Sequence, residues 1–372
     1  MTSATETQTT PPPQTTTNVL RTDGSARWAA LEEAVLPGIV GLLVAAIVGD
    51  FLILSFGQSP GTVYRLLFEG TWGNAYGFGQ VLYKTTTLTF TGLAVAVGLR
   101  AGLFNIGAES QLAAGGFMAA VVGLALPPGL PSLLTLPVYL VAAALGGGIV
   151  GGIPGILKAK FGAHEVITTI MLNFIVLALL NYIVAEHLKV PGSLHTSEIH
   201  GGGLPRLSNY IGGFHGSAAN VVIFIALAVA LATGWFLFRT RRGFELRAVG
   251  LQPEAAEYGG VNVGSVWWRA MALSGAIAGL GGLNFVLGYK LYYEDAFASG
   301  AGFLGIAVAI VGRNHPLGVV LAALVFATIS QGGLAVNAVV PKQMVDVLQA
   351  VVIIAVAASV PEVRRMLRRG AR

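Results

Sequence analysis

Three polar side chains able to hold a solute inside a membrane lie between two long apolar runs. Asn105, Glu109 and Gln111 occupy this stretch, which begins at Arg100. Polar and charged groups are costly beside hydrocarbon, so they need either partners or a water-filled cavity. Asn105 and Glu109 are four residues apart, which places both on one face of a helix, whereas Gln111 points elsewhere. We expect all three to line a pathway for a polar solute.

A second polar group opens a later apolar segment. Glu165, Thr168, Thr169 and Asn173 have the spacing of one helical face. One interpretation is a polar interior face, which makes Thr168, Thr169 and Asn173 candidate pathway residues. The alternative is a helix start in which a carboxylate faces the positive end and the threonine hydroxyls bond to their own helix. The spacing alone leaves both open.

A third group follows the basic run Arg239–Arg242. Pro253 suits the first position of a helix, and the paired glycines after Tyr258 suit its end. The pattern predicts a short amphipathic helix on the cytoplasmic surface, which docks a soluble partner; the alternative is an ordinary basic loop. The candidate coupling residues are Arg247, Gly250, Glu254, Ala255, Ala256 and Gly259.

Searches for catalysis find nothing. The chain has no cysteine and no Gly-Lys dipeptide, which excludes thiol nucleophiles and a phosphate-binding P-loop. His164-Glu165 begins a zinc-protease pattern, but Thr168 stands where its second histidine belongs. Ser274 has no histidine within a span to activate it. We therefore predict no enzyme, metal or cofactor. The basic residues sit in short clusters beside apolar runs, which also argues against nucleic acid.

Composition defines the class of protein that must position these residues. The 372-residue chain is 54% hydrophobic and only 10% charged, whereas soluble domains are about a quarter charged. We predict an all-α membrane protein with about ten spans and broken or half helices. Residues 302–312 are too short to cross alone and form a half-helix unless they extend back to Phe297. The predicted spans are 36–57, 80–98, 109–127, 134–157, 166–186, 219–238, 266–288, 302–312, 316–332 and 343–360.

The ends of the chain are polar. Residues 1–30 are rich in Thr, Pro and Gln and predict a disordered cytoplasmic tail, residues 31–362 the transmembrane permease domain, and residues 363–372 a basic cytoplasmic tail. Lys and Arg in short loops mark the cytoplasmic side. Because ten is an even number of spans, both termini are expected on the cytoplasmic side of the plasma (inner) membrane. The marker positions are Arg100, Lys158, Lys160, Arg239–Arg242, Arg313 and the C-terminal arginines.

Four motifs resemble the permease subunits of ATP-binding-cassette (ABC) importers, in the branch that serves nucleosides and simple sugars. They are Arg-Ala-Gly-Leu-Phe-Asn-Ile-Gly-Ala-Glu-Ser-Gln at 100–111, Glu-Val-Ile-Thr-Thr-Ile-Met-Leu-Asn at 165–173, Arg-Ala-Val-Gly at 247–250 with Ala255-Ala256, and the run 302–318. Ser110 departs from the glycine usual in the first motif. The resemblance implies a core of two permeases, with a second permease subunit as partner. It also implies a cytoplasmic ABC ATPase and an external substrate-binding protein or lipoprotein.

The solute is expected to be neutral and hydroxylated. Helix 80–98 carries five threonines between positions 85 and 91, and Phe90, Phe104 and Phe117 are candidates to stack on a base. We expect a nucleoside importer, with a simple-sugar importer as the alternative. An ion-coupled secondary transporter is a third hypothesis, but it needs an ionisable residue at mid-membrane. The candidates Asp50, Glu109 and Glu165 all sit near an end of their helix.

Overall fold

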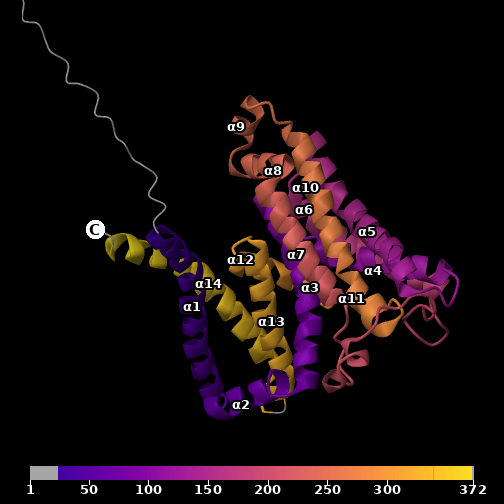
Figure 1. Ribbon diagram of the computed structural model, residues 1–372, viewed down its shortest axis with the longest axis horizontal. Helices are drawn as coiled ribbons and strands as arrows, with labels where there is room; N and C mark the ends of the chain where they lie inside the picture. The colour runs from indigo at the N-terminus through magenta and orange to yellow at the C-terminus, as the bar shows by residue number, and fades with distance from the viewer. Residues whose placement is uncertain (1–23, 338, 371–372) are drawn as a thin grey trace, which may run out of the picture.

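The computed structural model describes residues 24–337 and 339–370, and its regular elements there are all helices (Figure 1). The predicted N-terminal tail lies outside the described residues as far as residue 23, and helix α1 (Gly24–Ser55) begins inside it. The predicted basic tail falls within helix α14 (Lys342–Gly370) as far as Gly370, and residues 371 and 372 lie outside the described residues.

Each predicted span contains a helix. Besides α1 and α14, these are α3 (Ala75–Arg100), α4 (Ala108–Ala125), α5 (Ser132–Phe161), α6 (Glu165–Ile183), α7 (Val222–Arg239), α10 (Val263–Leu280), α12 (Ala301–Val311) and α13 (Pro316–Val336). Among the described residues, 7 helical stretches are long and apolar enough to cross a membrane. Helix α3 is not among them, and the apolar parts of α12 and α14 are shorter.

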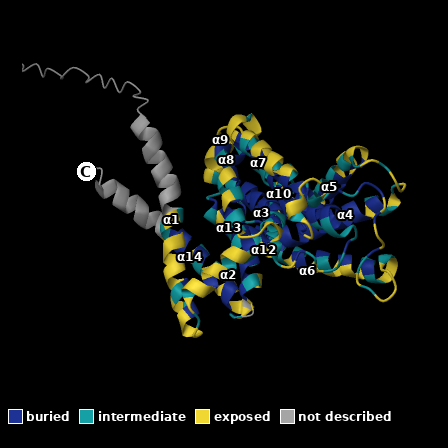
Figure 2. Cartoon of the chain, turned by 60° about the horizontal axis from the view of Figure 1, so that its bottom comes forward, coloured by how far each residue is buried: buried dark blue, intermediate teal, exposed yellow. Residues whose placement is uncertain are grey.

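Helix α3 is the central element of the bundle. It packs against α7, α10, α12 and α13, and nearly every residue from Leu88 to Gly98 is buried (Figure 2). The hydroxyls of Thr85 and Thr86 donate to carbonyls of their own helix, each at 2.8 Å. Such bonds remove the cost of burying a hydroxyl, which explains how a helix with so many threonines lies inside the protein.

Helices α5 and α10 cross at glycines. A Cβ on Gly147 would overlap the Gly275 carbonyl oxygen, and a Cβ on Gly275 would overlap that of Gly147. Gly151 is in a similar position against Met271. Small residues allow such backbone contact between membrane helices, where dispersion and weak hydrogen bonds hold the pair together. The glycines thus allow close packing of α5 against α10.

Helix α12 is a half-helix. At eleven residues it is about 16 Å long, roughly half of a bilayer core of about 30 Å. Its first residue lies against the middle of α3, where the Thr91 hydroxyl donates to the Ala301 carbonyl at 3.1 Å. The chain before it leaves α10 through α11 (Gly282–Phe285) and the π-helical turn η4 (Val286–Lys290). Broken segments of this kind are tolerated at membrane depth only where protein or water surrounds them.

Two further helices, α2 and α8, lie outside the spans predicted from hydropathy. Helix α2 (Pro60–Thr71) lies at the end of the bundle opposite α8 and α9 (Figure 1). Helix α8 (Arg241–Leu251) begins at Thr240, whose side chain accepts a hydrogen bond from the Gly243 amide. The helix predicted after Pro253 is present as α9 (Pro253–Tyr258), and it directly follows α8, so this part of the chain forms a pair of helices.

Candidate substrate pathway and coupling site

Asn105 and Gln111 form a buried amide pair. Asn105 Nδ2 donates to Gln111 Oε1 at 2.8 Å, and Gln111 Nε2 donates back to Asn105 Oδ1 at 3.0 Å. Asn105 Nδ2 also donates to Ser274 Oγ, and that hydroxyl donates to the Ala94 carbonyl of α3. Asn105 precedes α4, so the helical spacing that paired it with Glu109 does not apply. The pair locks the α3–α4 junction to α10.

Glu109 caps the half-helix. Its two carboxylate oxygens accept hydrogen bonds from the backbone amides of Gly300 and Gly302, at 2.7 and 2.6 Å. The N-terminus of a helix carries about half a positive charge, and its first amides have no partner within the helix. Glu109 therefore satisfies two of these amides and compensates this charge. It also borders a small cavity of about 130 Å³ together with Ala113, Leu177 and Phe297.

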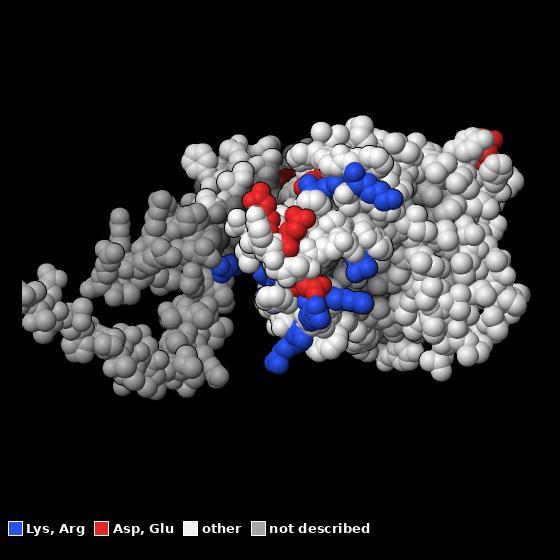
Figure 3. All heavy atoms as spheres, turned by 90° about the horizontal axis from the view of Figure 1, so that it is seen from above, with Lys and Arg blue, Asp and Glu red and all other residues white. Residues whose placement is uncertain are grey.

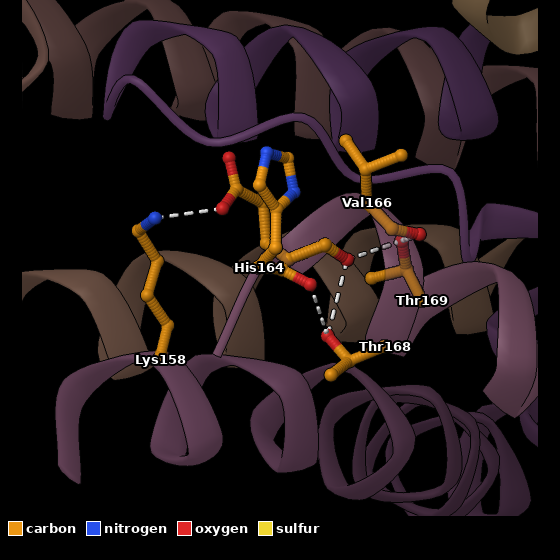
Figure 4. A network of polar contacts seen from close by, with 6 residues as sticks. Lys158, His164, Val166, Thr168 and Thr169 are labelled. Atoms are coloured by element: carbon orange, nitrogen blue, oxygen red, sulfur yellow. Dashed lines mark hydrogen bonds and ion pairs between the residues drawn. The ribbon is translucent and has the colours of Figure 1, made fainter. Parts of the chain in front are cut away.

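The α6 residues mostly serve their own helix and its neighbours (Figure 4). Thr168 and Thr169 donate to the Glu165 carbonyl at 3.1 and 2.7 Å, which matches the alternative of a self-bonded helix start. The Glu165 carboxylate pairs with Lys158 of α5 at 2.7 Å. Asn173 bridges to the first motif: its Nδ2 donates to the Ile106 carbonyl, and its Oδ1 accepts from the Ser110 amide.

A second, larger cavity has a volume of about 380 Å³, within the usual range for small-molecule sites. Its walls come from α3, α4, α11, α13, α14, and α12 with the segment that precedes it. Three aromatic side chains line it, Tyr83, Phe285 and Phe297. Its polar lining consists of Lys84, Thr87, Ser299, Ser330, Asp346 and Gln349. Of the six predicted pathway residues, Glu109 borders the smaller cavity, and the other five line neither of the two cavities.

A strained segment separates the two cavities. Phe297, Ala298 and Ser299 line both of them. Ala296 and Ser299 have φ values of 57° and 46°, in the left-handed region that side chains other than glycine rarely adopt. Phe297 stacks on Phe285 with ring centroids 4.8 Å apart. The Glu109 cap, this stack, the edge contact between Phe297 and Tyr293 and the hydrogen bond from the Ser299 hydroxyl to the Ala296 carbonyl all hold the segment in its conformation.

The charged residues of the large cavity are not among the ionisable candidates expected from the sequence. Lys84 and Asp346 both lie within predicted spans, and an ionisable residue inside a span is a functional candidate by default. Weighing Asp50, Glu109 and Glu165 alone was therefore incomplete. The aromatic side chains expected from the sequence to stack on a base, Phe90, Phe104 and Phe117, line neither of these cavities. Phe90 is fully buried, and Phe117 packs edge-on against Tyr293.

Helix α8 sits directly on the α3–α4 junction. A Cβ on Gly250 would overlap the Arg100 carbonyl oxygen, so only glycine permits this approach. The guanidinium groups of Arg100 and Arg247 lie over the Phe238 ring, at 5.6 and 5.3 Å from its centroid. Arg100 Nε also donates to the Asn314 carbonyl at 3.0 Å, in the turn between α12 and α13. Helix α8 therefore contacts the first motif, and Arg100 of that motif also bonds to the turn that follows α12.

The electrostatics of this junction are set by Arg100 and Arg247. His315, in the same turn, stacks on Phe238 at 5.4 Å. Burial, together with the nearby Arg100 charge, lowers the pKa of His315 from its ordinary value. The imidazole is therefore neutral at physiological pH and adds no third cation beside the ring.

Helices α8 and α9 present an exposed surface on which large apolar side chains lie beside acidic ones. Tyr258 is 96% exposed and Leu251 is 88% exposed, and Ala255 is exposed beside them. Ala256 is instead buried and belongs to the packing of the helix pair. Glu254 and Gly259 are exposed, and Gly260 ends the turn with a φ of +84°. Basic and acidic side chains gather on the same end of the molecule (Figure 3).

Comparison with known proteins identifies the class. A family model described as "Branched-chain amino acid transport system / permease component" matches residues 77–357, and the chain belongs to that permease family. It is thus a multi-pass membrane protein and a non-catalytic permease component of an ABC transporter. No solved structure matches the chain significantly.

Several curated relatives are similar over most of their length. The chain is 38% identical to the guanosine ABC transporter permease protein NupP of Bacillus subtilis, over 86% of this chain and 92% of the relative. It is 32% identical to the nucleoside ABC transporter permease protein NupB of Lactococcus lactis, over 87% and 90%. It is 33% identical to the glucose ABC transporter permease protein TsgB13 of Haloferax volcanii, over 85% of each chain.

The Glu109 cap leads to a first prediction. In Glu109→Gln an amide group replaces one acceptor, so either the Gly300 or the Gly302 amide loses its partner. Loss of a hydrogen bond to a buried charged group costs about 1.5–3 kcal/mol. We expect a lower melting temperature for the detergent-solubilised protein and a transport rate reduced by about tenfold or more. Glu69→Gln is the matched control because Glu69 forms only an exposed pair with Arg65. Identical melting of both variants would contradict the cap.

Proposed function

We propose that this chain is one of two permease subunits of an importer that carries nucleosides inward through the 380 Å³ cavity. The chemistry of this cavity supports the proposal most directly. Aromatic rings suit a nucleobase, whereas hydroxyl, amide and charged groups suit a ribose. One lysine and one aspartate line it, so it has no excess charge for an ionic solute. The guanosine and nucleoside permeases among the relatives support the same solute class.

The half-helix further favours a neutral solute. Half-helix N-termini at mid-membrane attract anionic groups when they face a binding site. Here Glu109 already occupies that position, so the α12 terminus offers little attraction to an anion. Asn105, Gln111, Thr168, Thr169 and Asn173 contribute to the pathway in this proposal by fixing the helices around it. The simple-sugar alternative is supported by the glucose permease relative.

The proposed topology has ten crossings or half-crossings, with both termini in the cytoplasm. Basic residues support this orientation because Arg100, Lys158, Arg247 and Arg313 lie at the end that carries α8 and α9. The exposed surface of α9 at that end, which includes Ala255 and Tyr258, would dock the cytoplasmic ABC ATPase. A second permease, an external binding protein or lipoprotein and the plasma membrane complete the proposed assembly.

Uptake measurements test the solute. In a host without other nucleoside importers, co-expression of the chain with its partner subunits should allow accumulation of labelled uridine and adenosine above labelled ribose. Accumulation should disappear when the partner ATPase cannot hydrolyse ATP, which is the internal control. Accumulation of ribose alone would favour the sugar alternative. Uptake of a branched-chain amino acid without either would reject the nucleoside proposal.

A further inference from the structure

The large cavity has an aromatic side whose rings hold one another in place. Phe285 and Phe297 are stacked with an interplanar angle of 23°. Tyr289 contacts both Tyr83 and Phe285, at centroid distances of 5.5 and 6.2 Å. These contacts connect rings from α3, α11, η4 and the segment before α12. A planar unsaturated ring in the cavity would therefore meet a preformed aromatic wall.

The cavity also has a polar side formed by α3, α13 and α14. Lys84 Nζ donates to Ser330 Oγ at 3.1 Å, which fixes the ammonium group at the wall. Asp346 and Gln349 are three residues apart and lie on the same face of α14. Asp346 is exposed although it lies in the apolar part of α14, Gln343–Val356. A carboxylate avoids lipid, which indicates that this face of α14 borders the aqueous cavity.

The chemistry of the polar side matches two neighbouring hydroxyl groups. A carboxylate has two oxygens that accept hydrogen bonds, and ammonium and amide groups donate to hydroxyl oxygens. An acidic side chain that accepts from a ribose hydroxyl is the device that dinucleotide-binding sites use. We infer that Asp346 is a specificity-determining residue that recognises the vicinal 2′ and 3′ hydroxyls of a ribonucleoside, with Lys84 and Gln349 as donors. This inference rests on the proposed nucleoside function.

The consequence is discrimination against the 2′-deoxy solute by the permease itself. A site built to bond a hydroxyl rejects an analogue without it, because its polar groups are left unpaired. The complete importer is reconstituted with its unaltered binding protein, and uptake of uridine and 2′-deoxyuridine is compared in wild type and Asp346→Asn. The binding protein's own preference affects the uridine-to-deoxyuridine uptake ratio of wild type and variant equally, so it cancels when the two ratios are compared. We expect Asp346→Asn to lower the uridine-to-deoxyuridine ratio by about tenfold.

Matched variants separate recognition from general damage. Asp295→Asn changes an aspartate that lines neither cavity and should leave the ratio unchanged. Phe285→Leu should lower uptake of both nucleosides equally, whereas Phe224→Leu, which alters a ring exposed on the outside of α7, should not. If Asp346→Asn does not assemble, the same ratio is measured in Gln349→Leu, for which we expect a smaller decrease in the same direction.

Two different failures are distinguishable. An unchanged ratio in an Asp346→Asn importer that still transports both nucleosides would overturn the role of Asp346 and leave the nucleoside function intact. Equal loss of uridine and deoxyuridine uptake in Asp346→Asn would indicate that Asp346 only balances the charge of Lys84. This result would also overturn its role in recognising the hydroxyls. Failure of the wild-type importer to accumulate either nucleoside would instead reject the proposed function.

Discussion

Gly275→Val is expected to abolish formation of the folded permease. At this position α10 meets α5 backbone to backbone, and even a Cβ would overlap the Gly147 carbonyl oxygen. The neighbouring glycine contacts along the same crossing, at Gly151 and Gly279, prevent the helices from sliding apart locally. Overpacking a well-packed interior costs about 1–3 kcal/mol for extra methylenes and more when backbone must move. A β-branched side chain at such a contact exceeds what the bundle can absorb.

The measurement is the yield of monodisperse protein after solubilisation in a mild detergent. Gly264→Val, on the same helix, is the matched control because the nearest atom to its added Cβ, the Ala159 Cβ, lies 3.5 Å away. We expect near-normal yield for the control and aggregated protein for Gly275→Val. Gly275→Ala should give an intermediate yield and a lower melting temperature. Equal yields of all three variants would show that α5 and α10 do not meet as described.

Ala255→Arg and Tyr258→Ala are expected to weaken docking of the partner ATPase while the permease still folds. Both side chains are exposed on α9, so their replacement disturbs no packing within the chain. Buried aromatic anchors contribute about 2 kcal/mol or more to an interface when they are hot spots. Solute uptake should therefore fall by about tenfold or more, with an unchanged amount of permease in the membrane. Solute-stimulated ATP hydrolysis by the reconstituted importer should fall in parallel.

The choice of alanine matters in this experiment. Ala256 is 7% exposed, so a charged residue there would disrupt the α8–α9 pair itself and would not report on docking. Tyr210→Ala is the control for Tyr258→Ala, because Tyr210 is also exposed but lies in the segment between α6 and α7. Normal stimulated hydrolysis in Ala255→Arg and Tyr258→Ala would contradict the assignment of α9 as the ATPase contact.

Local sequence patterns predicted most of the helices because the formation of a helix depends mainly on residues that are close in the sequence. A helix satisfies its backbone within one segment, so an apolar run of the right length locates it in any membrane protein. The short run at 302–312 located α12 for the same reason, and the helix begins at Ala301 and does not extend back to Phe297. Helix α8 was missed because its first turn is a run of charged residues that reads as a basic loop, and its cap is a single Thr240 side chain.

The roles of the polar residues were harder to predict. Helical spacing placed Asn105 with Glu109, but Asn105 lies before α4 and pairs with Gln111 instead. Within a membrane protein, apolar side chains face both lipid and interior, so periodicity carries little information about which face is buried. A polar side chain in such a segment can meet solute or a partner on another helix, and its own sequence neighbourhood is the same in both cases.

The sequence by itself determined that this chain is an all-helical membrane permease without catalytic machinery, because composition, apolar run length and motifs are properties of contiguous residues. The tertiary structure decided which side chains line a common cavity. Lys84, Phe285 and Asp346 are brought to one cavity from α3, α11 and α14, and Glu109 is taken up by α12. Helix packing makes these choices because the partner of a buried polar group is selected in space, among residues up to hundreds of positions away.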